Sequence, residues 1–154
     1  DNINIRNIYP FEYEYDNNLF IGLDSVTGNE FEIFHFASGE IGLLQRKKLK
    51  KILTDPEYSE MKKIVFFHHH PFNREMMMKM DDADKVMDLL KNKVDVLCFG
   101  HNHQKEIWKN KNEIDLIIAS GKTTETDKNN SFCFYEVTIN KKITEVKEVF
   151  LMNE

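Results

Sequence analysis

The sequence predicts an α/β fold with a mixed sheet, in which a strand–helix–strand unit is followed by antiparallel strands. Residues 64–67 and 94–99 are short apolar runs of the kind that form central strands, covered on both faces. Residues 81–90, between them, have the periodicity of an amphipathic helix. Such a unit nearly always crosses over right-handed, so the two strands are expected to be parallel. After residue 103, short alternating segments separated by turn residues are typical of antiparallel strands.

A hairpin and a helix are expected before this unit. Residues 11–15 alternate as in a half-exposed strand, residues 16–18 have turn chemistry, and residues 19–23 have the pattern of a buried strand. The helix that follows would place four apolar side chains on one face: Leu44, Leu49, Ile52 and Leu53. It should end near Asp55, because the residue before a proline is disfavoured in the helical conformation.

The part of the chain after residue 103 should form one antiparallel meander. Its expected strands are residues 106–108, 115–118, 132–137 and 145–149. The turns between them would lie at residues 109–112, 124–130 and 140–142. This meander would complete the mixed sheet that begins with the strand–helix–strand unit.

The composition is that of one globular domain over residues 1–154, with 41% hydrophobic and 31% charged residues. The net charge of -5 argues against a general nucleic-acid binder, which needs a basic surface. No apolar run reaches the roughly 20 residues that span a bilayer. Cys98 and Cys133 lie in apolar strand patterns, so we expect two buried thiols, which favours a reducing, cytoplasmic location.

Five of the six histidines directly follow the two central strands. They stand at residues 68–70, after the first strand, and at residues 101–103, after the second. Because the carboxyl ends of neighbouring parallel strands lie on one edge of the sheet, the two groups should meet there. Imidazoles gathered at strand ends indicate a metal site, and with it hydrolytic chemistry. The sixth histidine, His35, is expected to be structural.

The spacing within each group predicts which imidazoles face the same way. Side chains alternate along an extended segment, so His101 and His103 should point to one side. In the first group His68 and His70 would share one side and His69 would face the other. Spacing makes His101 and His103 the simplest candidate metal ligands, whereas in the first group geometry alone does not choose.

These motifs resemble those of the calcineurin-like metallophosphoesterase superfamily. Here His-His-Pro stands at residues 69–71 and Gly-His-x-His at residues 100–103, each after a strand. Further resemblance to the family lies upstream, in residues 19–25, Gly39 and residues 43–49. Together these segments extend the resemblance over roughly residues 10–122. The ordered series of motifs is far more specific than Gly-His-x-His alone.

The resemblance implies roles for three histidines. His69 and His101 are similar to ligands of the second metal of the family, and His103 is similar to a ligand of the first. The implied cofactors are two divalent ions, for which manganese, iron and zinc all suit the ligands. The implied reaction is hydrolysis of a phosphate mono- or diester by a hydroxide that bridges the metals. The implied fold is a four-layer αββα sandwich.

The early motifs of the family are absent from this chain. Asp-x-His, Gly-Asp and Gly-Asn-His supply the bridging carboxylate, most ligands of the first metal and the histidine thought to protonate the leaving group. Asp24 resembles a structural aspartate of the family, so it is no substitute. Three imidazoles cannot hold two divalent cations close together without carboxylates. We therefore expect the C-terminal half of the sandwich, inactive or nearly so on its own, and assign no catalytic residue.

Two other interpretations remain open. The chain could be a non-catalytic module with one incidental metal or none, or three histidines could hold a single zinc ion and a water. The number of metals bound separates these cases. The methionine-rich residues 76–80 fit core filling and a helix start, or else a flexible lid. An incomplete domain should also expose apolar surface and a sheet edge, which favours self-association.

Overall fold

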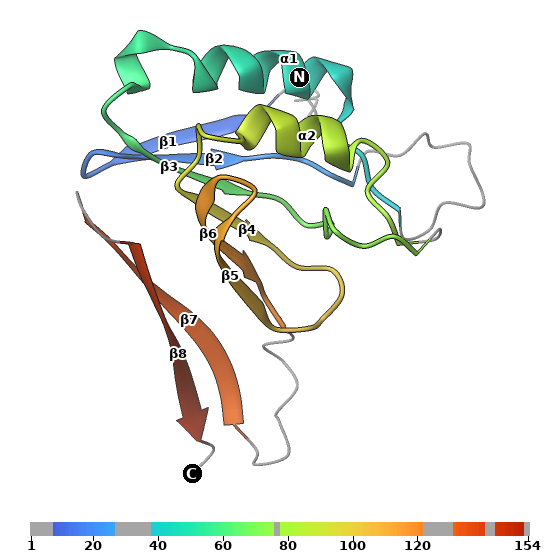
Figure 1. Cartoon of the computed structure of the whole chain (residues 1–154), viewed down its shortest axis with the longest axis vertical. Helices are drawn as coiled ribbons and strands as arrows, with labels where there is room; N and C mark the ends of the chain where they lie inside the picture. The colour runs from blue at the N-terminus through green and yellow to red at the C-terminus, as the bar shows by residue number, and fades with distance from the viewer. Residues whose placement is uncertain (1–7, 27–37, 76–77, 122–130, 141–143, 153–154) are drawn as a thin grey trace, which may run out of the picture.

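The computed structural model describes residues 8–26, 38–75, 78–121, 131–140 and 144–152. These residues form a six-stranded sheet in the order β1-β2-β3-β4-β6-β5 and a separate two-stranded sheet of β7 and β8 (Figure 1). The large sheet contains β1 (Phe11–Tyr15), β2 (Asn18–Gly22), β3 (Lys62–Phe66), β4 (Val96–Phe99), β5 (Glu106–Lys111) and β6 (Ile114–Ala119). The remaining elements are β7 (Ser131–Ile139), β8 (Thr144–Met152), α1 (Gly42–Leu53), α2 (Ala83–Leu90) and a short 3-10 helix (Pro56–Tyr58).

The centre of the large sheet is parallel, which the sequence predicts for β3 and β4 alone. β2, β3, β4 and β6 run in one direction, whereas β1 and β5 pair antiparallel at the two edges. The β3–α2–β4 unit is thus confirmed, and so is the mixed sheet. The predicted hairpin is also present, since β1 and β2 pair antiparallel. Asp16 and Asn17 between them have positive φ values of 46° and 62°, the conformation of a tight hairpin turn. However, all five residues of β1 are exposed rather than half-exposed.

The two faces of the large sheet are covered differently. Both helices lie over one face (Figure 1), and Leu19, Val65 and Ile117 beneath them are fully buried. On the opposite face Ile64 and Leu116 pack with side chains of the small sheet in a second, smaller core. The fold is therefore mixed α/β, with one helical layer and a small sheet on the other side.

The buried face of α1 differs from the prediction at one position. Leu44 is 75% exposed, and Gln45 is buried in its place. Gln45 is held by Asp24, since its Nε2 donates to the carbonyl of Asp24 at 2.8 Å and its Oε1 accepts from the Asp24 amide at 3.0 Å. A specific pair of hydrogen bonds therefore outweighs the apolar pattern. The helix ends at Leu53, close to the predicted end at Asp55.

Helix α2 begins at Ala83, two residues later than predicted. The preceding residue, Asp82, caps the start of α1. The carboxylate of Asp82 accepts hydrogen bonds from the amides of Ile41 and Gly42, at 3.1 and 3.0 Å, and pairs with Arg46 at 3.0 Å. These amides begin α1 and would otherwise lack helical partners. Asp82, which is 4% exposed, therefore caps α1 and joins the starts of both helices.

The prediction of one C-terminal meander is wrong. β5 and β6 form a hairpin inside the large sheet, with β6 parallel to β4, while β7 and β8 form their own sheet. β5 also extends through the predicted turn, which shifts to Asn112 and Glu113, both with positive φ. Alternation identifies strands but not their partners, and partners depend on contacts distant in sequence.

Some predictions concern residues outside the described ranges or only partly inside them. His35, residues 76–77 and the expected turn at residues 124–130 lie outside, as does the side chain of Cys133. Cys98 is a free thiol and a small part of the residue is exposed. The burial of its thiol raises its pKa to about 11. In the described part of the chain, neither helix has the length and apolar character needed to cross a membrane.

Candidate functional site

The two histidine groups lie at the same edge of the large sheet. β3 and β4 are parallel neighbours, and the register pairs Phe66 with Cys98 at their carboxyl ends. Beyond these residues the two loops stay in contact, because the amide of Gly100 donates to the carbonyl of His68 at 3.0 Å. The predicted convergence of residues 68–70 and 101–103 at one edge is therefore correct for the backbone.

Three imidazole rings gather at this edge. The ring centroids of His69 and His101 are 4.5 Å apart, and His68 lies 5.1 Å from each of them. Nδ1 of His101 and Nε2 of His68 are hydrogen-bonded at 3.1 Å. The cluster thus contains His69 and His101, which the family resemblance singles out, together with His68, which it does not.

His69 is held in place from β2 and from the segment before α1. Ser25 Oγ and His69 Nδ1 are hydrogen-bonded at 2.9 Å, and the same oxygen accepts from the amides of His68 and His69 at 3.2 and 3.1 Å. Gly39 lies against the imidazole, since an added Cβ would come within 2.3 Å of two ring atoms of His69. Only glycine allows this approach, so the position of the ring depends on it.

The environment keeps His69 neutral. Its side chain is almost fully buried, and burial lowers its pKa from 6.5 to about 4, with further lowering from His101 and His68. Two nearby groups oppose this shift: the charge of Asp24 and a hydrogen bond with the backbone of Ser25. Metals bind the neutral imidazole, so His69 is in the form that can donate to a metal over the whole physiological range.

His70 belongs to a different environment. Its ring packs edge-on against Phe99, with centroids 4.6 Å apart, and near Phe72 and Trp108. Its Nδ1 accepts the amide of Phe72 at 3.2 Å, and burial lowers its pKa. The expectation that His68 and His70 share a side is wrong, because β3 ends at Phe66 and the residues that follow no longer alternate.

His103 lies apart from the cluster. It is exposed, and none of the ring contacts within the described residues involves it. His101 and His103 have φ values of 74° and 57°, so neither is extended, and the argument that alternation points them to one side fails. The loop curls directly after Gly100, and the turn decides where each ring lies.

The imidazole nitrogens of this cluster are chemically suitable metal ligands, but the described residues do not arrange enough of them around one point. Neutral imidazole nitrogen binds zinc, iron and manganese. However, in the ranges given above no group of three or more His, Cys, Asp or Glu side chains is arranged to hold a metal ion. As they stand, the three rings are therefore close together without forming a metal-binding group.

Two residues of this edge were not foreseen as functional. Ser25 follows β2, which is also parallel to β3, so its place at the same edge could have been inferred from topology. His68 is part of the His-His-His run, but strand alternation assigned it to the side of His70. An apolar pocket of about 440 Å³ opens beside His68, between this edge and β7, with Phe66 and Tyr135 among its lining residues.

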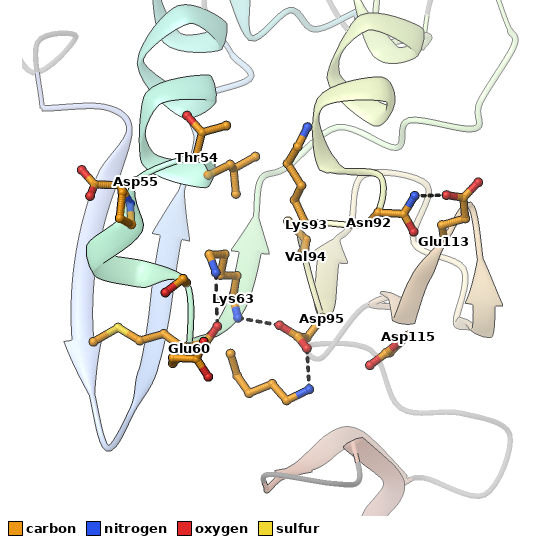
Figure 2. A pocket seen from close by; sticks show the side chains of 15 residues that line it. Thr54, Asp55, Glu60, Lys63, Asn92, Lys93, Val94, Asp95, Glu113 and Asp115 are labelled. Atoms are coloured by element: carbon orange, nitrogen blue, oxygen red, sulfur yellow. Dashed lines mark hydrogen bonds and ion pairs between the residues drawn. The ribbon is translucent and has the colours of Figure 1, made fainter.

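A polar cavity of about 580 Å³ occupies the opposite edge of the sheet, where β3 and β4 begin (Figure 2). Among its charged groups, those of Lys62, Lys63 and Asp95 are held by hydrogen bonds. Asp95 accepts the ammonium of Lys62 at 2.5 Å and the amide of Lys63 at 2.8 Å. The buried ammonium of Lys63 donates to the carbonyls of Tyr58 and Met61. These contacts fasten the starts of the strands, so this cavity is not the candidate site.

Comparison with known proteins finds a family match that covers both histidine motifs. The family model described as calcineurin-like phosphoesterase matches residues 2–105, a range that contains both histidine loops. The motifs predict a resemblance over roughly residues 10–122. The match starts earlier in the chain than that range and also ends earlier. No curated protein matches the chain.

Proposed function

Since the chain belongs to the calcineurin-like phosphoesterase family, we propose that it is part of a metal-dependent enzyme that hydrolyses phosphate mono- or diesters. The observation that carries the proposal is the gathering of His68, His69 and His101 at the carboxyl edge of a parallel sheet. Active sites of open α/β sheets form at this edge. Divalent ions in such sites activate water and stabilise charge on the phosphoryl group.

His69 and His101 are the proposed metal ligands of this chain. Support comes from their adjacent rings, the neutral state of His69, and the hold of Ser25 and Gly39 on its position. His103 is proposed as a further ligand on the strength of the family motif. Its ring would have to turn toward the cluster, which rearrangement of the loop after Gly100 would allow.

The site is proposed to be one part of a dinuclear centre whose carboxylate ligands come from outside these residues. Two divalent ions need more ligands than imidazoles alone provide. The apolar pocket beside His68 leaves room for a further segment. We therefore propose that the chain alone is inactive or nearly so, and that it forms the C-terminal half of a four-layer sandwich in which β7 and β8 belong to the second sheet.

Self-association through the sheet face opposite the helices is also proposed. The register of β1, β2 and β3 places Phe11, Tyr13 and Phe66 on this face, and they are 43%, 54% and 40% exposed. Exposed aromatic side chains on a sheet near an unpaired edge favour association. A monomer in size-exclusion chromatography at high concentration would contradict this.

Metal binding tests the assignment. Equilibrium dialysis against manganese or zinc, followed by elemental analysis, should give no more than one ion per chain. His69→Ala and His101→Ala should each weaken that binding at least tenfold, whereas Asp115→Asn, at the opposite edge, should leave it unchanged. Two tightly bound ions per chain would contradict an incomplete centre, and unaltered affinity in both histidine variants would contradict the ligands.

Hydrolysis tests the proposed incompleteness directly. With added manganese, the 154-residue chain should hydrolyse an activated phosphodiester only at background rate. A form extended upstream that carries an Asp-x-His and a Gly-Asn-His should gain activity, and His103→Ala in that form should lower it. Turnover by the 154-residue chain at ordinary enzyme rates would overturn this part of the proposal.

A mononuclear site is the second candidate, favoured by the third ring in the cluster. His68 lies 5.1 Å from both other rings, so three imidazoles are close without any contribution from His103, although their rings would have to turn to hold one ion together. A single zinc with three histidines and a water is a known catalytic arrangement. One ion per chain, lost on His68→Ala but kept on His103→Ala, would support it. The reverse pattern would support the family assignment.

A further inference from the structure

We propose that a groove beside the histidine loops binds a planar heteroaromatic ring, of the size of a nucleobase, carried by the phosphate ester. The groove has a volume of about 820 Å³, and Phe72, Asn102, Glu106 and Trp108 are among its lining residues. Such a volume lies in the range of small-molecule sites. This inference rests on the proposed function, because it names the substrate class of the same site.

The groove has an aromatic wall fixed from behind. Phe72 and Trp108 meet edge to face, with centroids 5.5 Å apart, and both pack on the buried ring of Phe99. The ring of His70 lies against the same three rings. Because this wall is packed into the core, it needs little ordering to accept a ligand, which preserves binding free energy.

The two outer rings are partly buried against the core, and the ammonium of Lys111 lies over a face of each. The ammonium of Lys111 lies 4.0 Å from the centroid of Phe72 and 4.2 Å from that of Trp108. A lysine side chain is long and well hydrated, so it can move aside at small cost. A nucleobase stacked in its place would gain a favourable stacking contact with an aromatic side chain.

Polar groups at the rim favour a heteroaromatic ring over a plain apolar one. Asn73 Nδ2 donates to Asn102 Oδ1 at 2.9 Å, and Asn73 Oδ1 accepts the amide of Glu75 at 2.8 Å. The side-chain oxygen of Asn102 is engaged, and its Nδ2 makes no hydrogen bond with the described residues, so Asn102 can donate to a ligand. The carboxylate of Glu106 supplies an acceptor on β5. A donor and an acceptor next to stacking rings match the edge of a nucleobase.

The position of the groove connects it to the histidines. Asn102 lies between His101 and His103, and Phe72 lies three residues after His69. The hydrogen bond between Asn73 and Asn102 joins these two loops. A phosphate at the histidine cluster and a base in the groove would therefore be served by adjacent residues of the same loops, as a single nucleotide requires.

Trp108 is the only tryptophan of the chain, so its fluorescence reports on the groove directly. The 154-residue protein, in buffer with chelator, would be titrated with adenosine, guanosine and cytidine. Ribose 5-phosphate and phenol serve as ligands that lack a base or its polar edge. We expect saturable quenching by at least one nucleoside and none by ribose 5-phosphate. No saturable change with any nucleoside, or phenol equal to the best nucleoside, would overturn the inference.

Variants locate the binding. Asn102→Ala should weaken the best nucleoside at least fivefold, and Phe72→Leu, which keeps an apolar side chain but removes the ring, should do likewise. Lys93→Ala at the opposite edge is the matched control. Circular dichroism checks that each variant is folded. Equal affinity in both groove variants and the control would contradict the groove.

The titration separates this inference from the proposed function. Nucleosides carry no phosphate and the buffer holds no metal, so quenching depends on the groove alone. Nucleoside binding by a protein whose extended form fails to hydrolyse phosphate esters would sink only the phosphoesterase proposal. Hydrolysis by the extended form with no nucleoside binding would sink only the groove.

Discussion

The two edges of the large sheet treat ionisable groups in opposite ways. At the amino edge, charges of opposite sign meet, as in the pair of Lys62 with Asp95. At the carboxyl edge, like groups meet, since His68, His69 and His101 contact one another. Paired charges fasten strands, whereas a buried imidazole such as that of His69, whose pKa is lowered, resists protonation. Geometry of the second kind indicates a ligand site, and that of the first kind a structural one.

The largest effect should come from filling the space beneath His69. Gly39→Ala places a methyl group 2.3 Å from the ring and 2.6 Å from the carbonyl of Ser25, so the backbone must shift. We expect a loss of about 3 kcal/mol in the free energy of unfolding, measured by urea denaturation. Gly100→Ala is the control, since its methyl group would meet Ser120 Oγ at 3.3 Å, and it should cost about 1 kcal/mol or less.

If both variants lose the same stability, the carboxyl edge is not built around the position of His69. Similar stability of Gly39→Ala and the unaltered protein would contradict the close approach itself. A crystal structure of Gly39→Ala with a displaced imidazole would sharpen the comparison, because the amino edge has no ring supported in this way among the described residues.

The next effect should be a pH dependence that belongs to the carboxyl edge. His69 has a pKa of about 4 in the folded protein against 6.5 when unfolded. Between these values the unfolded chain takes up a proton and the folded protein does not, so the free energy of unfolding falls as pH falls from 6.5 toward 4. The loss should reach about 2 kcal/mol in chelator-treated protein, with His70, whose pKa is also lowered, adding in the same direction.

Denaturation at a series of pH values measures this slope. His69→Gln should remove its own share of the loss and leave that of His70. A free energy of unfolding that is constant or rises as pH falls through this window would show that the pKa of His69 is not lowered.

The smallest effect should come from the amino edge. Asp95→Ala removes an acceptor of the Lys63 amide and the partner of Lys62. We expect a loss of about 1.5 kcal/mol, because the side chains of Lys62 and Asp95 are partly exposed and water replaces some of their interaction. Asp115→Ala, whose carboxylate is exposed in the same cavity, should change stability by less than about 0.5 kcal/mol. Equal losses in the two variants would remove the distinction between paired and solvated carboxylates there.

Much of the arrangement could be predicted from sequence, because it depends on local patterns and topology. The apolar runs before His68 and before His101 indicate parallel strands, and parallel strands bring the two loops to one edge. The N-terminal hairpin could also be predicted, since Asp16 and Asn17 favour the positive φ of its turn.

The errors occurred where a local pattern was extended too far. The alternation assumed for His101 and His103 fails because both residues have positive φ, which spacing does not reveal. Leu44 is exposed because Gln45 is bound by Asp24, a contact between residues 21 apart. Strand partners after residue 103 also depend on distant contacts, and therefore one meander became a hairpin and a separate sheet.

The carboxylate of Asp82 has a consequence for how the helical layer comes apart. It stands at the start of α2, yet its hydrogen bonds go to the first amides of α1. Melting of α2 would free those amides and remove the ion-pair partner of the Arg46 guanidinium. The first turn of α1 therefore cannot fray while α2 stays folded without breaking a buried ionic contact. Hydrogen exchange at Ile41 and Gly42 should then keep pace with exchange in α2, so that the two helices open as one cooperative unit.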